Sequence, residues 1–228
     1  MKAPIPSNEA RRRAALASYR ILDTANERVY DDIVRLAAYI CQVPIATISL
    51  VDEQRQWFKA KVGMRKSETP RDIAFCAHTI LDAGPLIVED ATKDGRFADN
   101  DLVTHAPRIR FYAGFPLVNS DGLALGALCA IDRRRRQLDS AQKEAMKALS
   151  RQVMVLLEMR RISAHLADAL AQVRTLRGLI PICAWCRKIR DDKGYWNDME
   201  AYLRTSTGAD FTHGICPECL EKERPRRA

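Results

Sequence analysis

Residues 45–51 have the sequence IATISLV, and residues 56–60 have the sequence QWFKA after the polar stretch DEQR at 52–55. The first stretch is rich in β-branched side chains, which pack well on the pleated surface of a sheet. The second stretch follows a turn-like tetrapeptide, so the two together predict a buried strand and its return strand in a hairpin. This hairpin is the element from which the rest of the fold can be traced.

Two helices are predicted before the hairpin, over residues 8–19 and 26–41. The second has apolar side chains at helical spacing, and in the first Arg11, Arg12 and Arg13 are expected to form a solvated face. After the hairpin we expect a loop over 63–70, a short helix over 75–81, a strand over 86–88, a polar excursion over 93–107, and strands over 110–118 and 123–131. Hairpin-linked strands bracketed by helices predict an α+β domain with a mainly antiparallel sheet.

An ordered set of short motifs runs through this domain: ILDT at 21–24, PIATISLVD at 44–52, RQWFKA at 55–60, AFCAH at 74–78, RFADN at 96–100 and GALCAID at 126–132. In this order the motifs resemble the GAF domains of bacterial sensor proteins, over about residues 5–155. The resemblance implies a six-stranded antiparallel sheet with a small-molecule pocket on one face. It leaves the ligand open, because neither a bilin-type cysteine context nor a cyclic-nucleotide signature is evident.

The resemblance also suggests which side chains line such a pocket. The candidates are aromatic or polar: Trp57, Phe75, Cys76, His78, Asp90, Phe97, Tyr112 and Cys129. Each of them could equally be an ordinary core residue, since buried cysteines are most often small hydrophobic side chains. Cys76 and His78 are two residues apart on a predicted helix and therefore point in different directions, which argues against a nucleophile–base pair.

A long helix is predicted over residues 140–179, with a seam of apolar side chains in an a/d heptad pattern. The seam consists of Val155, Met159, Ile162, Leu166, Ala169, Val173, Leu176 and Ile180. Two interpretations are open: the helix packs along its own domain, or it pairs with a second copy in a parallel coiled coil. The regular seam favours the second, so we expect a homodimer formed through residues 155–180.

The C-terminal part contains two C-x-x-C pairs, Cys183-Ala-Trp-Cys186 and Cys216-Pro-Glu-Cys219. Four thiolates in two such turns can complete a tetrahedral Zn²⁺ shell, which is typical of a structural site, and His213 is an alternative ligand. We expect a zinc-ribbon or treble-clef-like module that depends on the metal to fold. The segment also resembles a C-terminal cysteine extension found on some bacterial PAS, GAF and response-regulator proteins.

Charge and hydropathy restrict the function classes. The formal net charge is +8, and residues 133–177 hold 11 basic and 4 acidic side chains, whereas the cysteine module is nearly neutral. A nucleic-acid-binding zinc module is normally strongly basic, so we do not expect a nucleic-acid partner. No apolar run reaches the length of a membrane span and the N-terminus lacks the apolar core of a signal peptide, so we expect a cytoplasmic protein without membrane contact.

These features predict three parts: a GAF-like sensory domain over 1–138, a signalling helix over 139–179 and a zinc module over 180–228. The expected function is a signal-transduction sensor that binds a small ligand and passes the signal through a dimeric helix to an interaction module for a protein partner. No kinase, cyclase or hydrolase motif is present, so we expect no enzymatic activity. The alternatives are a thiol or zinc redox sensor, a nucleic-acid-binding regulator, and a methionine sulfoxide reductase, whose catalytic-cysteine pattern is not matched.

Overall fold

A computed structural model describes residues 2–177, 180–191 and 193–223, and the chain forms two compact units, residues 1–166 and residues 167–228. Several predicted features fall outside the described residues: positions 178–179 at the end of the signalling helix, Asp192 in the predicted turn, and positions 224–228 of the module.

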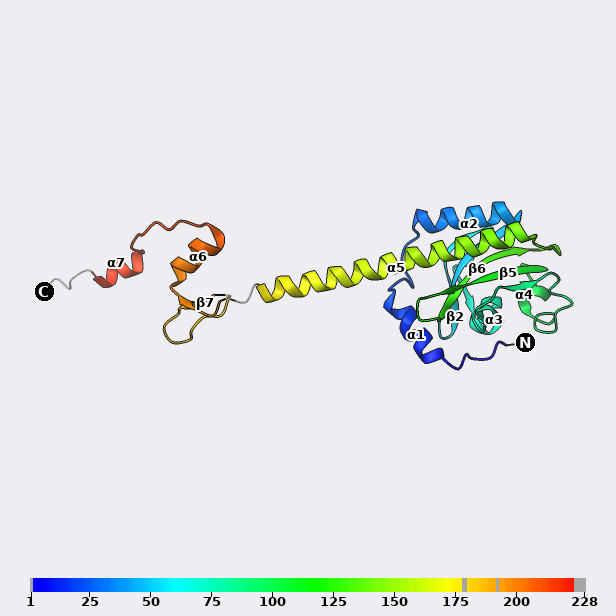
Figure 1. Ribbon diagram of the computed structural model, residues 1–228, viewed down its shortest axis with the longest axis horizontal. Coiled ribbons are helices and arrows are strands. Elements are labelled where there is room, and N and C mark those ends of the chain that lie inside the picture. The colour runs from blue at the N-terminus through cyan, green and yellow to red at the C-terminus, as the bar shows by residue number, and fades with distance from the viewer. Residues whose placement is uncertain (1, 178–179, 192, 224–228) are drawn as a thin grey trace. The chain divides into compact units, whose positions relative to one another are not determined.

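The first unit is built on a six-stranded antiparallel sheet (Figure 1), which confirms the predicted sheet. The strand order is β3 (Glu68–Pro70), β2 (Arg55–Val62), β1 (Ile45–Val51), β6 (Ala124–Asp132), β5 (Phe111–Val118) and β4 (Leu86–Val88). The hairpin of β1 and β2 pairs Val51 with Gln56, as the short polar turn requires. Strand β3 lies within the segment that was expected to be a loop.

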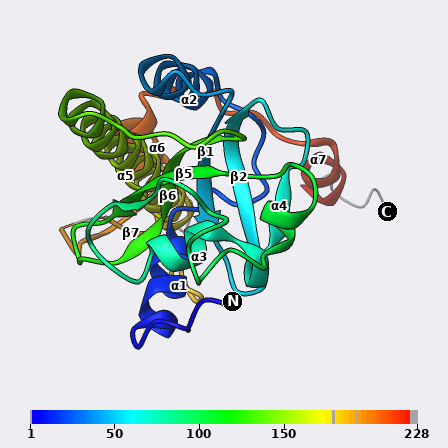
Figure 2. The same ribbon diagram turned by 90° about the vertical axis from the view of Figure 1, so that its right-hand side faces the viewer.

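Helices cover both faces of the sheet (Figure 2). One face is covered by α1 (Glu9–Ser18), α2 (Arg28–Cys41) and the first part of α5 (Ser140–Arg177). The other face is covered by the 3-10 turn η1 (Arg71–Ile73), α3 (Phe75–Thr79) and α4 (Asp101–Thr104). The short helix α4 lies inside the segment that was expected to be a polar excursion.

Each face of the sheet has its own hydrophobic core, because successive strand residues point to opposite sides. Ile48, Leu50 and Trp57 belong to the core beneath α2 and α5. Ile45, Val51 and Cys129 belong to the core beneath α3. All seven residues of β1 are buried, so the central strand is covered on both sides.

Arg12 corrects the expectation of a solvated arginine face on α1. Its side chain is 1% exposed and donates from Nε and Nη2 to the two carboxylate oxygens of Glu9, each at 2.8 Å. Glu9 also accepts from Arg71 Nη1 at 2.6 Å, which attaches α1 to η1 on the other side of the β1–β2 turn. The bidentate pairing gives two nitrogens of the buried guanidinium a charged acceptor, whereas Arg12 Nη1 has no hydrogen-bond partner among the described residues.

A second buried cation connects the sheet to α5. Lys59 on β2 donates from Nζ to Glu27 Oε1 at 2.6 Å and to the carbonyl of Ala25 at 2.7 Å. Glu27 Oε1 also accepts from Arg160 Nη1 on α5 at 2.9 Å. Glu27 lies immediately before α2, so one carboxylate is shared between the sheet and the long helix.

The second unit contains the hairpin of β7 (Ile189–Arg190) and β8 (Trp196–Asn197), followed by α6 (Met199–Thr207) and α7 (Pro217–Glu223). Gly194 lies in the turn at φ 88°, a conformation that glycine adopts without strain. Among the side chains described in this unit, Ile189 is the one hydrophobic residue that is buried. So small a core supplies little folding free energy. No helix in the described parts of the chain has the length and apolar character needed to span a membrane.

Candidate ligand site

A cluster of hydroxyl and thiol groups lies inside the core beneath α3. Thr47 and Ser49 come from β1, Tyr112 from β5 and Cys129 from β6, and they meet Cys76 and Thr79 of α3. Strand register explains the meeting, since Thr47 pairs with Cys129 and Cys129 pairs with Gly114 on the same face of the sheet. All six side chains are at most 2% exposed.

Hydrogen bonds connect the members of this hydroxyl–thiol cluster. The Tyr112 hydroxyl lies 2.7 Å from Thr79 Oγ1 and donates to Cys76 Sγ at 3.3 Å. The two sulfur atoms of Cys76 and Cys129 are 3.2 Å apart. Thr47 Oγ1 and Ser49 Oγ are 2.8 Å apart. Buried polar groups need such partners, because an unpaired one costs about 1–3 kcal/mol.

Gly114 makes room for the cluster. A Cβ atom at this position would lie 2.2 Å from the Tyr112 hydroxyl oxygen and 2.6 Å from Thr79 Oγ1. Real side chains do not approach so closely, so any larger residue would displace the Tyr112–Thr79 hydrogen bond. The glycine in the FYAGFPLV strand is therefore required by a side-chain contact.

An aromatic group borders the cluster. The rings of Phe75 and Phe97 are stacked with their centroids 4.0 Å apart, and His78 meets Phe97 edge-on at 4.8 Å. Phe75 also lies 5.0 Å from the Tyr112 ring. This arrangement brings together six of the residues suggested by the sequence: Phe75, Cys76, His78, Phe97, Tyr112 and Cys129.

Trp57 and Asp90 do not join these six. Trp57 pairs with Leu50 and lies in the core on the opposite face of the sheet. Asp90 lies in the loop after β4, where its Oδ1 accepts a hydrogen bond from Thr92 Oγ1 at 2.6 Å. That hydrogen bond lowers the pKa of Asp90, so this carboxylate has a local structural role.

Thr47, Ser49 and Thr79 were not among the residues selected from the sequence. The two strand residues carry a detectable signal, since they stand two apart in the otherwise apolar IATISLV and so face the same side. Thr79 carries no such signal. Its role depends on α3 packing against β5, a contact between residues 33 positions apart.

Two further polar atoms on this face have no hydrogen-bond partner within the described structure. They are Gln56 Oε1 and Thr69 Oγ1, and both residues are less than 9% exposed. Gln56 pairs with Val51 on one side and with Thr69 on the other, which places both atoms on the α3 side of the sheet. Unsatisfied buried acceptors favour a bound polar molecule or water.

Burial and hydrogen bonding shift the acidities of the cluster in opposite directions. Burial raises the pKa of Cys76 and of Tyr112 well above their ordinary values. Burial also acts to raise the pKa of Cys129. Hydrogen bonds with Cys76, Tyr112, Thr47 and Ser49 outweigh the effect of burial, so the pKa of Cys129 is lowered.

A cleft of about 510 Å³ reaches the edge of this cluster. It is lined by His78, Thr79, Leu86 and Arg96 on the α3 side and by Lys2 and Pro4 of the N-terminal segment. Thr79 belongs to both features, because it lines the cleft and its hydroxyl contacts that of Tyr112. The cleft therefore gives a small molecule a route toward the buried polar groups.

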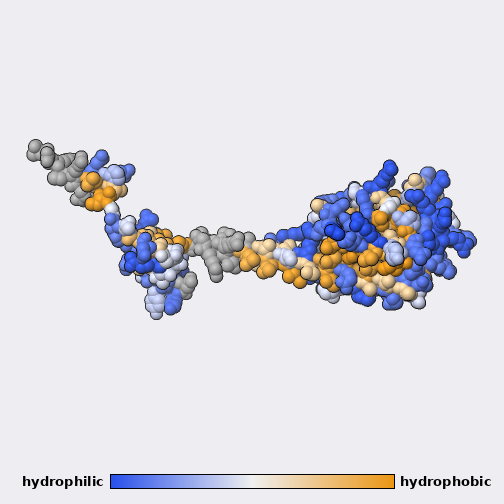
Figure 3. Space-filling model, turned by 90° about the horizontal axis from the view of Figure 1, so that it is seen from above, coloured by the Kyte–Doolittle hydropathy of each residue, from blue (hydrophilic) through white to orange (hydrophobic). Residues whose placement is uncertain are grey.

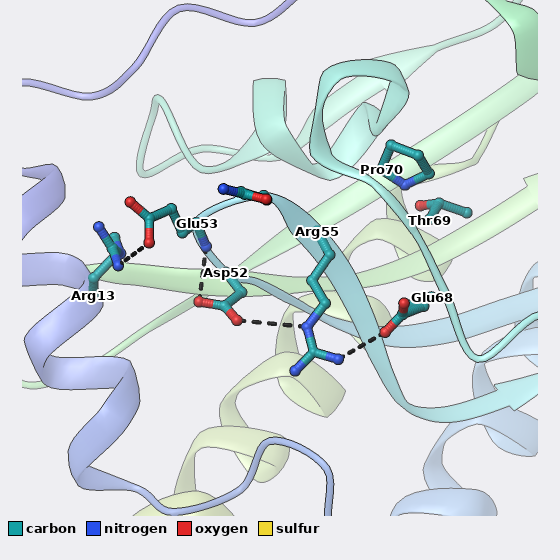
Figure 4. Close-up of a pocket in the computed structure, with 8 residues that line it drawn as sticks. Arg13, Asp52, Glu53, Arg55, Glu68, Thr69 and Pro70 are labelled. Atoms are coloured by element: carbon teal, nitrogen blue, oxygen red, sulfur yellow. Dashed lines mark hydrogen bonds and ion pairs between the residues drawn. The ribbon is translucent and has the colours of Figure 1, made fainter.

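A wider cleft of about 710 Å³ lies at the β1–β2 turn (Figure 4), but its charged side chains are paired with one another. Arg55 donates to Glu68 at 2.7 Å and lies 3.5 Å from Asp52, and Arg13 donates to Glu53 at 2.5 Å. These ion pairs involve most of the charged groups of the cleft, although Arg13 Nε and Thr69 Oγ1 of its lining have no hydrogen-bond partner among the described residues. The α3 side is the better candidate for a binding site.

The C-terminal cysteines form two local pairs. The backbone N–H of Cys186 donates to Cys183 Sγ at 3.5 Å, and backbone N–H groups lower the pKa of Cys183 and of Cys216. Such turns suit a thiolate ligand of Zn²⁺. Among the described residues, however, no three His, Cys, Asp or Glu side chains are grouped as metal ligands, and His213 lies 3.3 Å from Glu200. The zinc site remains a prediction.

Comparison with known proteins agrees with the geometry. The family model described as GAF domain matches residues 26–157. The blue-light absorbing form of the Thermosynechococcus elongatus PixJ GAF-domain superposes with a TM-score of 0.52 at 16% identity, over 74% of this chain and 98% of that one. The GAF domain of an Acinetobacter phosphoenolpyruvate-protein phosphotransferase gives a TM-score of 0.49 at 17% identity, over 67% and 94%.

A curated relative corrects one expectation. A protein of Pseudomonas aeruginosa named as a cyclic di-GMP phosphodiesterase is 47% identical over 133 residues, which are 58% of this chain and 23% of that protein. The expectation of a protein without enzymatic activity is wrong on this finding, because the relative is named for an enzyme. The present chain spans less than a quarter of the relative's length.

Proposed function

This chain belongs to the GAF domain family, and we propose that it is a cytoplasmic signal-transduction sensor that takes part in the control of cyclic di-GMP hydrolysis. A small polar ligand would bind between α3 and the sheet. The observation that carries this proposal is the buried hydroxyl–thiol cluster, which borders a cleft at Thr79.

The chemistry of the cluster supports ligand binding. An apolar layer between helix and sheet is stable without hydroxyl groups, whereas this one contains four together with two thiols. Ligand sites typically combine an apolar lining with a few convergent polar groups. Phe75, Phe97 and His78 supply aromatic contacts beside the hydroxyl and thiol groups.

The connection to cyclic di-GMP rests on the Pseudomonas relative. The 133 matched residues are 23% of that protein, so most of the relative lies outside the match. The GAF domain would therefore act as a regulatory part of a cyclic di-GMP phosphodiesterase system. The signal would leave the domain along α5. That helix would pair with a second copy and present the C-terminal cysteine module, stabilised by Zn²⁺ on Cys183, Cys186, Cys216 and Cys219, to a protein partner.

A chimera tests the proposal. Residues 26–157 replace the matched segment of the Pseudomonas phosphodiesterase, and hydrolysis of cyclic di-GMP is measured in cell extract, which retains the small molecules of the cell. Tyr112→Phe removes a hydroxyl from the cluster, and Tyr39→Phe removes one from the exposed face of α2 as a matched control. Loss of one ligand hydrogen bond of about 1 kcal/mol raises the dissociation constant of the ligand about fivefold and lowers the occupancy by up to that factor.

We expect Tyr112→Phe to change the hydrolysis rate by about that factor and Tyr39→Phe to leave it unchanged. Equal rates for the chimera and both variants would overturn the regulatory role of the cluster. The full 228-residue chain is assayed beside the chimera. Product formed by this chain alone would place the hydrolysis within these residues.

A further inference from the structure

Three of the seven cysteines are buried in the first unit, and two of them are in contact. Cys76 Sγ and Cys129 Sγ are 3.2 Å apart, whereas Cys41 lies in the other core, beneath α2 and α5. A disulfide bond needs a sulfur–sulfur distance of about 2.05 Å. Closing the gap therefore takes a movement of about 1 Å, which small side-chain rotations can supply.

We propose that Cys76 and Cys129 form a thiol pair that peroxide oxidises to an internal disulfide. This modification site lies within the hydroxyl–thiol cluster, but the inference does not depend on a ligand or on cyclic di-GMP. It assigns the two thiols a chemical role that packing alone does not require, since small apolar side chains would fill the same space.

The surroundings of the two sulfurs assign their roles. Cys129 Sγ has the Cys76 thiol at 3.2 Å and Ser49 Oγ at 3.9 Å as neighbours that can donate. The Tyr112 hydroxyl lies between the two sulfurs, 3.6 Å from Cys129 Sγ, and donates to Cys76 Sγ at 3.3 Å. Donors around a sulfur stabilise the thiolate, which is the nucleophilic form of cysteine. Ser49 is the additional hydroxyl beside Cys129, so we take Cys129 as the attacking residue and Cys76 as the resolving one.

The reaction is balanced with peroxide as the named oxidant. The Cys129 thiolate attacks one peroxide oxygen, the oxygen–oxygen bond breaks, and a sulfenic acid and hydroxide form. The hydroxide then takes up the proton that Cys129 released when its thiol ionised, which gives the first water. The Cys76 thiol then attacks the sulfenic sulfur, a sulfur–sulfur bond forms, and a second water leaves. Two thiols are oxidised by two electrons, and one peroxide is reduced to two waters.

Access to the pair follows the cleft on the α3 side. Thr79 lines that cleft, contacts the Tyr112 hydroxyl, and Tyr112 contacts both sulfurs. Helix α3 has only five residues, Phe75–Thr79, so a local opening breaks few backbone hydrogen bonds. Peroxide is small enough to enter through such an opening, whereas larger alkylating reagents are excluded from the closed form.

Disulfide formation would change the binding face. The bond would join α3 to the central strand β6 and remove both thiols from their contacts with Tyr112. A reversible covalent link at this point would fix the position of α3, and a thiol reductant would release it.

The test uses the full chain treated with peroxide, unfolded in the presence of an alkylating reagent, digested and analysed by mass spectrometry. We expect a peptide pair linked through Cys76 and Cys129, lighter by two hydrogens, which disappears after reduction. Cys41→Ser is the matched control for a buried cysteine and should retain the linked pair. Cys76→Ser and Cys129→Ser should each lose it completely.

The intermediate distinguishes the two roles. With a sulfenic-acid-specific dione present, Cys76→Ser should be labelled on Cys129, and Cys129→Ser should not be labelled on Cys76. Alanine variants with unchanged circular dichroism repeat the comparison if a serine variant fails to fold. A wild-type chain whose Cys183–Cys186 pair oxidises while Cys76 and Cys129 stay alkylatable would overturn the proposal. That outcome would not affect the chimera experiment.

Discussion

Glu9 is the residue on which the attachment of α1 depends. Its carboxylate accepts hydrogen bonds from the buried Arg12 and from Arg71, which come from two different elements. Burial acts to raise its pKa, but the hydrogen bonds of Arg12 and Arg71 outweigh burial and lower the pKa to about 2. The ionised form is thus bound more tightly in the folded state than in the unfolded one.

Glu9→Gln should lower the free energy of unfolding at pH 7 by about 2 kcal/mol, because two guanidinium groups lose their charged acceptor. The depressed folded pKa means that the contribution of Glu9 is complete above its ordinary value of 4.5 and is lost as the pH falls toward about 2. Urea unfolding of both proteins across this range should show the difference shrinking with acid.

Glu53→Gln is the control for that measurement. Glu53 pairs with Arg13 on the surface, where its side chain is 58% exposed, and an exposed ion pair contributes about 0–1 kcal/mol. A loss of stability with Glu9→Gln no larger than with Glu53→Gln would contradict the role given to Glu9.

At this scale the sequence groups some residues that the structure also groups. Phe75, Cys76 and Phe97 are candidates because aromatic and thiol groups are typical of pockets, and they share one core; their contact with a ligand stays a prediction. Trp57 failed because β1 and β2 are buried on both faces, so alternation does not tell which core a residue enters. The expectation for Arg12 failed because Glu9, the carboxylate with which Arg12 pairs, is also bound by Arg71, 62 positions further along the chain than Glu9.

At the scale of elements, the first part of α5 follows one of the two interpretations that its sequence left open, and the pairing with a second copy stays a prediction. Met146, Val153 and Leu157 are buried against the sheet, so the first part of the helix packs on its own domain. Further along, the seam is solvent-exposed, and apolar surface gathers along this part of the helix (Figure 3). The exposed members are Val155, Met159, Ile162 and Leu166, each between 49% and 61% exposed.

Ile162→Lys should shift the protein from dimer to monomer. The free energy of association falls by about 1.5–3 kcal/mol for each large apolar side chain that is no longer buried between the two helices. The two lysines would also repel each other. Sedimentation equilibrium of the full chain measures the effect. Ser163→Lys, next to the seam on the same helix, should remain dimeric. A wild-type chain that is monomeric at every concentration would refute the dimer.

The strands and long helices could be predicted because each is set by a local pattern. The hairpin of β1 and β2, the helix α2 and the helix α5 all follow from periodicity in the sequence. Strand β3 was missed because Glu68–Pro70 contains no apolar run, unlike the equally short β4, and helix α4 was missed because four residues are too few to show a helical period. Both are held by their neighbours, as in the pairing of Thr69 with Gln56.

At the scale of the whole molecule, the two units differ in what stabilises them. The first has two apolar cores, and the second buries only Ile189 among its described hydrophobic side chains. We therefore expect about one zinc per chain in protein purified without added metal, because four thiolates form one closed shell. Chelation should unfold the second unit and leave the first intact.

Elemental analysis and circular dichroism check this expectation. The double variant Cys183→Ser, Cys216→Ser should lose the metal, whereas Cys41→Ser should keep it, since Cys41 lies in the core of the first unit. A second unit that is folded and metal-free would contradict the zinc module. The spacing of the cysteines could suggest this site from sequence, but the distance between the two pairs depends on folding that local patterns do not encode.

The shared carboxylate of Glu27 has a consequence for the direction of communication. Lys59 Nζ of β2 and Arg160 Nη1 of α5 donate to the same oxygen atom of Glu27. A displacement of the strand therefore alters the strength of the hydrogen bond from the helix. Linkage of this kind is reciprocal: if an event at the sheet strengthens self-association through α5 by some factor, self-association strengthens that event by the same factor. The apparent affinity of the domain for the event at the sheet would then depend on the concentration of the protein itself. A cell could raise that affinity by making more of the chain.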